Sequence, residues 1–186
     1  MDNTLILAKW KCTLLNCQDH DLLESQIELI LDRNLRLVSD IKIPLSRLRI
    51  TAQILAQNQN RPLNLSELSR KMRISLPTLR KILVEFEAIF FIRLLNCEGN
   101  EARPVLFFED QGEATYLSGG RFDLMDDLER LAFAHLRIPF FYEPGLNFDC
   151  FQYRQQGGAY VPLCFRSGRK TIGFIISLDP MRLCSH

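Results

Sequence analysis

The chain has 186 residues, of which 47% are hydrophobic and 10% aromatic, so it has enough apolar side chain for one sizeable core or two small ones. This composition excludes a disordered tail, and the lack of an apolar run of membrane-spanning length excludes an integral membrane protein. The apolar stretch from Leu5 to Ala8 is too short for a signal peptide, so we expect a cytoplasmic protein. In that compartment the six cysteines are expected to remain thiols.

The formal net charge is +1, but the charges are unevenly distributed. Residues 47–93 carry nine basic and three acidic side chains, whereas residues 94–135 carry three basic and nine acidic ones. The two blocks have balances of +6 and −6. A nucleic-acid partner would respond to the local charge, so the small total does not exclude one.

The first 57 residues predict two helices. Apolar side chains recur every three or four residues over 21–38, as in an amphipathic helix. After Asp40, Pro44 and Ser46 a second helix is expected over about 45–57, and the segment 58–62 ends it.

Residues 64–88 predict a helix-turn-helix. Asn64 and Glu67 have the spacing of a capping box that opens a short helix, and the turn 73–75 follows. Ser75 caps a second helix in which Pro77 occupies the first turn. The buried stripe of this second helix is expected to be Leu79, Ile82, Leu83 and Phe86, with basic residues on its free face.

Strands are expected next, over 88–95 and 104–108, joined by a turn at Gly99 and Asn100. Three helices followed by a hairpin are the parts of a winged helix. Beyond Asp110 the pattern predicts a helix over 122–135 and short strands over 140–142, 148–153, 159–165 and 171–178. The fold class is therefore α+β, with a helical lead segment over 1–44, a winged-helix domain over 45–108 and a small α/β domain over 109–186.

Several segments resemble the C-terminal region of bacterial and archaeal AAA-type ATPases of uncertain function, a family with a winged helix and a nuclease-like domain. The most specific match is NLSELSRKMRISLPTLRKILVEFEAIFFIRLL over 64–95. The other matching segments are LESQIELILDRNL (23–35), VLFFEDQGEATYL (105–117), DLERLAFAHL (127–136), FQYRQQGGAYVPLCF (151–165) and TIGFIIS (171–177).

The sequence departs from this family in two ways. No Gly-rich loop ending in Gly-Lys-Ser/Thr is present, so we expect no ATP hydrolysis and no nucleotide cofactor. The resemblance also implies a domain like restriction endonucleases and junction resolvases, whose metal site needs a helix Glu, a strand Asp and a Glu-x-Lys. Acidic oxygens hold the Mg²⁺ in such a site.

Only the helix Glu of that implied metal site has a counterpart, namely Glu129. The strand acid falls at Pro162, with Tyr160 where a second acid often stands, and the Glu-x-Lys falls at Ile175 and Ser177. One carboxylate does not hold a hard divalent cation, so we expect a degenerate site without metal. The alternative is a metal-dependent nuclease that combines Glu129 with Asp149 or Asp179.

We expect the helix-turn-helix to bind duplex DNA, without catalysis. Its second helix would enter the major groove, while basic side chains of the first helix and the turn contact phosphates. The expected DNA-binding residues are Arg70, Lys71, Arg73, Pro77, Thr78, Arg80 and Lys81. The alternative is a protein-interaction module, as a remnant or partner of the ATPase or as a homodimer.

The acidic residues between 123 and 129 favour a solvated helix start, and the alternative is a surface that packs against the basic block. The histidines (His20, His135, His186) lack the spacing of zinc ligands relative to each other or to the cysteines. Cys12 and Cys17 have no matching second pair, and Cys184 with His186 lies at the terminus. No zinc site and no Cys-His nucleophile are therefore predicted.

Overall fold

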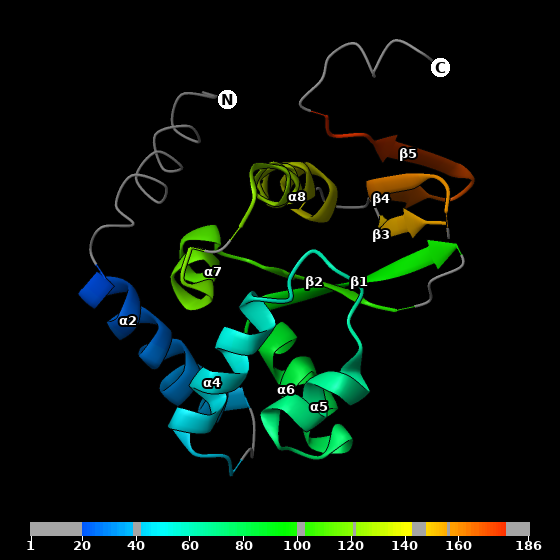
Figure 1. The fold of residues 1–186 in the computed structure, drawn as a ribbon. Helices are drawn as coiled ribbons and strands as arrows, with labels where there is room; N and C mark the ends of the chain where they lie inside the picture. The colour runs from blue at the N-terminus through cyan, green and yellow to red at the C-terminus, as the bar shows by residue number, and fades with distance from the viewer. Residues whose placement is uncertain are drawn as a thin grey trace. The chain divides into compact units, whose positions relative to one another are not determined.

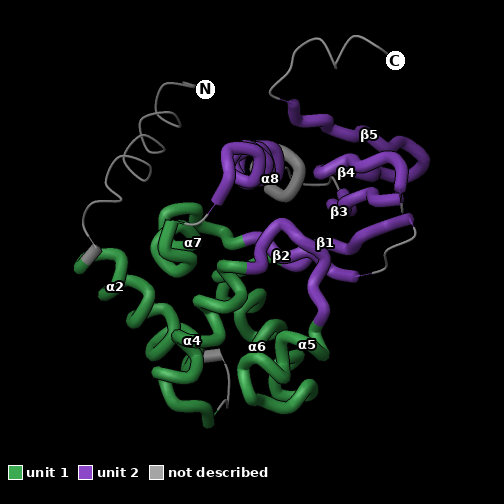
Figure 2. Tube along the Cα trace, viewed as in Figure 1, with its two compact units in different colours: residues 1–57, 65–93, 108–121 green, residues 58–64, 94–107, 122–186 purple. Residues whose placement is uncertain are grey.

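The computed structural model describes residues 20–38, 42–99, 103–120, 122–142, 148–155 and 157–177 (Figure 1). The fold is α+β, with helices and a five-stranded mixed sheet. The chain divides into two compact units (Figure 2): unit 1 is residues 1–57, 65–93 and 108–121, and unit 2 is residues 58–64, 94–107 and 122–186.

The first described element of unit 1 is the helix that the sequence predicts over 21–38. It consists of α2 (His20–Leu29), a π-helical turn η1 (Ile30–Asn34) and α3 (Leu35–Val38). The N–H of Leu35 donates to the carbonyl of Ile30, the i to i+5 bond of a π turn. Ile27, Leu31 and Leu35 are buried along one side of this helix, so the extra residue per turn keeps the apolar side facing the core.

The next three helices of unit 1 are α4 (Leu45–Ala56), α5 (Leu65–Met72) and α6 (Leu76–Ala88), which confirm the helices predicted for these segments. α4 packs against α5, and α5 packs against α6. The contacts are made by side chains that recur at helical spacing and are at most 5% exposed: Leu48, Ala52, Leu55, Leu68, Met72, Leu79, Ile82, Leu83 and Phe86.

The strand predicted over 88–95 begins later than expected. α6 continues to Ala88, Phe90 takes a positive φ of 54°, and the N–H of Phe91 donates to the carbonyl of Phe86. This turn exposes 64% of Phe90 and buries Phe91, whose ring meets that of Phe86 edge to face at 5.2 Å. Burial of a single ring therefore ends the helix, and β1 (Ile92–Gly99) starts only after it.

Unit 1 also contains α7 (Gln111–Ser118), a helix that the sequence analysis does not predict. The Asp110 side chain accepts a hydrogen bond from the N–H of Glu113 at its start, and Gly119 ends it with a φ of 74°. α7 packs against α2 and α4.

The sheet consists of β1, β2 (Val105–Phe108), β3 (Asp149–Arg154), β4 (Tyr160–Ser167) and β5 (Lys170–Phe174) in the order β2-β1-β3-β4-β5. β1 and β3 run parallel, with Asn96 opposite Phe151, and β3, β4 and β5 form an antiparallel meander. The strands predicted over 104–108, 148–153 and 159–165 are confirmed. The strand predicted over 171–178 is confirmed only to Phe174, because β5 ends there, residues 175–177 are not in a strand, and Leu178 lies outside the described residues.

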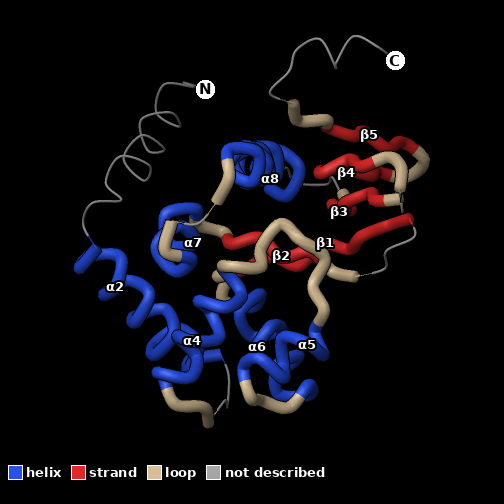
Figure 3. Tube along the Cα trace, viewed as in Figure 1, coloured by secondary structure: helices blue, strands red, loops and turns tan. Residues whose placement is uncertain are grey.

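Unit 2 places α8 (Leu124–Tyr142) beside β4 (Figure 3). The predicted helix over 122–135 is confirmed, but the predicted strand over 140–142 is wrong because α8 continues through these residues. The β-forming Phe-Phe-Tyr composition is a weak preference that a helix already under way overrides. In the unit 2 core Phe133 of α8 stacks on Phe107 at 4.5 Å, and Leu95, Val105, Leu163 and Phe165 surround them.

Two general expectations concern membranes and cysteines. Among the described residues, no helix has the length and apolar character needed to cross a membrane. Cys97, Cys150 and Cys164 form no disulfide among the described residues, whereas Cys12, Cys17 and Cys184 lie outside them.

Candidate nucleic-acid interface

The two helices of the predicted helix-turn-helix are joined by a tight turn in unit 1. Arg73 takes a positive φ of 52°, and its N–H and that of Ile74 donate to the carbonyls of Arg70 and Ser69 at the end of α5. The Ser75 side chain then accepts a hydrogen bond from the N–H of Thr78 at 3.2 Å, which caps α6. The predicted cap and the position of Pro77 in the first turn are both confirmed.

The outward face of α6 is basic at its N-terminal end. Pro77, Arg80 and Lys81 are exposed, one helical turn apart, while Leu79, Ile82, Leu83 and Phe86 are at most 2% exposed. Thr78 is half-buried, and its hydroxyl lies 2.7 Å from that of Ser75. The first turns of α6 therefore present two cations and a small polar side chain to solvent.

The end of α5 and the turn add further positive charge. Arg70, Lys71 and Arg73 are exposed. Among the described residues none of these three, nor Arg80 or Lys81, forms an ion pair with a carboxylate. We name the five side chains the basic cluster: Arg70, Lys71, Arg73, Arg80 and Lys81. Because no carboxylate in the described part of the chain pairs with them, their charges are available to an anionic partner.

Two residues near the basic cluster were not selected from the sequence. Arg47 of α4 donates from Nη1 to the carbonyls of Met72, at 3.3 Å, and Arg73, at 3.0 Å, so it caps the end of α5 with a positive charge. No sequence spacing indicates this contact across 26 positions. Val84 is 62% exposed on the outward face of α6, one turn beyond Arg80 and Lys81. Its spacing of three and four residues from Lys81 and Arg80 would have placed it on the outward face of the predicted helix.

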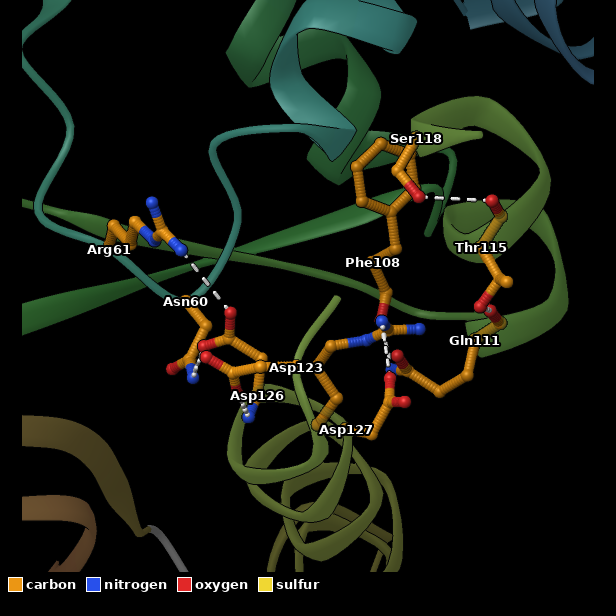
Figure 4. Close-up of polar contacts among 10 residues, drawn as sticks. Asn60, Arg61, Phe108, Gln111, Thr115, Ser118, Asp123, Asp126 and Asp127 are labelled. Carbon is orange, nitrogen blue, oxygen red and sulfur yellow. Dashed lines mark hydrogen bonds and ion pairs between the residues drawn. The ribbon is translucent and has the colours of Figure 1, made fainter. Parts of the chain in front are cut away.

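Unit 2 contains a second polar cluster around Glu129, the residue predicted as the remnant of a metal site. Glu129 is 6% exposed, and its Oε2 accepts hydrogen bonds from Nδ2 of Asn60 and, at 2.7 Å, from the hydroxyl of Tyr160. Nε2 of Gln152 donates to Oδ1 of Asn60, at 3.2 Å. Asn60 and Arg61 also reach Asp126 of α8, at 3.3 and 3.4 Å (Figure 4).

This cluster is built mainly from neutral hydrogen-bond donors. Burial, followed by the hydrogen bond to Glu129, raises the pKa of Tyr160, so its hydroxyl stays protonated and donates. Two positions predicted by the nuclease resemblance, Glu129 and Tyr160, thus lie together. Pro162 is buried without a side-chain oxygen, and Ile175 is 59% exposed.

The alternative carboxylate partners of Glu129 lie elsewhere or outside the described residues. Asp149 pairs with Arg166 in the β3-β4 register, six residues along β4 from Tyr160, or about 20 Å along a strand. Asp179 is outside the described residues. Within the described segments, no group of three or more His, Cys, Asp or Glu side chains is arranged to hold a metal ion.

The function of the two-helix surface and of the Glu129 cluster receives no support from similar proteins. Comparisons of the chain with protein-family models, curated proteins and solved structures gave no match.

Proposed function

We propose that the protein binds duplex DNA through α5, the following turn and α6, without catalysis. The observation that carries this proposal is the basic cluster, five exposed cations on α5, the following turn and α6 with no carboxylate partner among the described residues. In a helix-turn-helix, the start of the second helix contacts base edges. Arg80 and Lys81 lie there, so we assign them to base edges, and Arg70, Lys71 and Arg73 to phosphates.

The connectivity of residues 45–108 supports a winged-helix reading of this segment. α4, α5 and α6 are followed by β1 and β2, which are neighbours in the sheet. Pro62, between α4 and α5, forms an isolated antiparallel bridge with Val105 of β2. We expect this arrangement of a winged helix, in which a short extended segment follows the first helix and pairs with the hairpin.

The test is fluorescence anisotropy of labelled duplex DNA over a series of salt concentrations. We expect the logarithm of the binding constant to fall linearly with log salt, with a slope of roughly 0.9 per neutralised phosphate. Arg80→Ala/Lys81→Ala should weaken binding about tenfold or more, since each lost base contact is worth about 1–3 kcal/mol. No binding by the native chain at low salt would refute the proposal.

The matched control is Arg169→Ala/Lys170→Ala, which also removes two exposed cations, but from unit 2. If binding depends only on total charge, the two double variants weaken it equally. If the helix-turn-helix is the site, the control variant retains nearly native binding and the Arg80/Lys81 variant does not.

The non-catalytic part of the proposal rests on the surroundings of Glu129. Two neutral donors already occupy its Oε2, and Pro162 and Ile175 supply no side-chain oxygen to a cation. We expect no cleavage of plasmid or junction DNA in the presence of Mg²⁺. Cleavage that Glu129→Gln abolishes would establish the alternative, a nuclease that uses this carboxylate.

Relation to the AAA-type ATPases and a cytoplasmic location belong to the same proposal. The relation rests on the matching segments, above all residues 64–95. The cytoplasmic location is supported by the described cysteines, which form no disulfide with one another, as expected in a reducing compartment. An ATPase encoded next to this chain and co-purifying with it would support the relation.

A further inference from the structure

The helix formed by α2, η1 and α3 carries a line of exposed leucines opposite its buried side. Leu22, Leu29 and Leu37 are 61%, 51% and 78% exposed. At about 100° per residue, Leu29 lies some 160° around the helix axis from the buried Ile27. We name Leu22, Leu29 and Leu37 the outer leucine stripe.

The π turn keeps this stripe in line. Seven residues separate Leu22 from Leu29, and eight separate Leu29 from Leu37, which in a regular α-helix would turn Leu37 about 80° away from Leu29. The bond from the N–H of Leu35 to the carbonyl of Ile30 shows that η1 absorbs one extra residue. The stripe therefore behaves as a seven-residue repeat over about 22 Å, the pattern with which helices pair.

The charges beside the stripe change sign along the helix. Asp21 and Glu28 are exposed before Leu29 or next to it, whereas Arg33 and Arg36 are exposed after it. Arg36 also pairs with Asp32 at 2.7 Å, and Glu28 lies 3.3 Å from Arg49 on α4, with both carboxylates about half exposed. The N-terminal half, with Asp21, Glu24 and Glu28, is thus acidic, whereas Asp32, Arg33 and Arg36 give the C-terminal half a net charge of +1.

This charge order fits a second copy of the chain in antiparallel orientation. We propose that two copies pair through their outer leucine stripes about a twofold axis at Leu29. Leu29 then meets its own equivalent, Leu22 meets Leu37 to within one residue, and the acidic half of each helix faces the basic half of the other. Parallel pairing would place like charges together. The proposal is independent of DNA binding, although a dimer would present two copies of α6 to a two-part site.

Sedimentation equilibrium of the full chain over a concentration series tests the pairing. We expect a reversible monomer–dimer equilibrium, and Leu29→Glu should raise its dissociation constant about tenfold or more. Leu124→Glu is the matched control, because Leu124 is also 61% exposed but lies on α8 in unit 2. It should leave the equilibrium unchanged. Circular dichroism shows whether each variant keeps its helices.

The orientation is tested by disulfide trapping. Leu29→Cys should cross-link to its equivalent under mild oxidation. Leu37→Cys alone should form no more cross-linked dimer than the native chain, whereas a mixture of Leu22→Cys with Leu37→Cys should form more. Equal self-cross-linking of all three variants would overturn the antiparallel arrangement. A chain that remains monomeric at every concentration would overturn the whole proposal.

Discussion

Glu113 is a buried carboxyl group, and no cation among the described residues forms an ion pair with it. It is 3% exposed, and its Oε1 accepts a hydrogen bond from Nε2 of Gln26 on α2, at 3.0 Å. The nearby Asp110 carboxylate caps the same helix, while Arg49 of α4 is engaged with Glu24 at 2.6 Å. Burial, followed by the charge of Asp110, raises the pKa of Glu113 from 4.5 to about 8.

This shift gives the stability of the fold a pH dependence of definite sign. Between pH 4.5 and about 8 the folded chain holds a proton on Glu113 that the unfolded chain releases. The contribution is therefore present at low pH and is lost as pH rises, at up to about 1.4 kcal/mol per pH unit. Glu113→Gln keeps an oxygen for Gln26 and removes the ionisation. We expect the free energy of unfolding of this variant, measured in urea, to rise relative to that of the native chain between pH 5 and pH 8.5. If the two free energies change in parallel with pH, the raised pKa of Glu113 is contradicted.

At the scale of elements, the helices that sequence reasoning found are those whose apolar period is strong. α4 and α6 follow the spacing of their buried side chains, and the cap at Ser75 locates the start of α6. α7 was missed because it buries Gln111, Gly112 and Glu113, which a search for apolar periodicity passes over. Its limits were nevertheless present in the sequence, as the capping Asp110 and the final Gly119.

The candidate sites show the same division between local and long-range information. The basic cluster could be predicted because its members lie within twelve residues of one another, on two amphipathic helices and the turn that joins them. The partners of Glu129 could not, because Asn60 precedes it by 69 positions and Tyr160 follows it by 31. Polar residues that meet only after folding show no periodic pattern in the sequence. The π turn likewise has no characteristic composition by which it could be predicted.

At the scale of the whole molecule, the division of the chain into two units falls within β1 and within β2. β2 contributes adjacent rings to separate cores: Phe107 stacks on Phe133 in unit 2, and Phe108 meets Phe91 edge to face at 5.1 Å in unit 1. Because the two rings are neighbours along the chain, unravelling of β2 would take one buried ring from the core of each unit.

We therefore expect the two units to unfold in one cooperative transition. Phe107→Ala and Phe108→Ala each empty a fully buried site and should each destabilise the chain by about 3–5 kcal/mol. In differential scanning calorimetry both variants should shift a single peak to lower temperature. Phe90→Ala is the control, because that ring is 64% exposed and should shift the peak little. Two separated peaks, one of which stays at its native temperature in each variant, would show instead that the units unfold independently despite the shared strand.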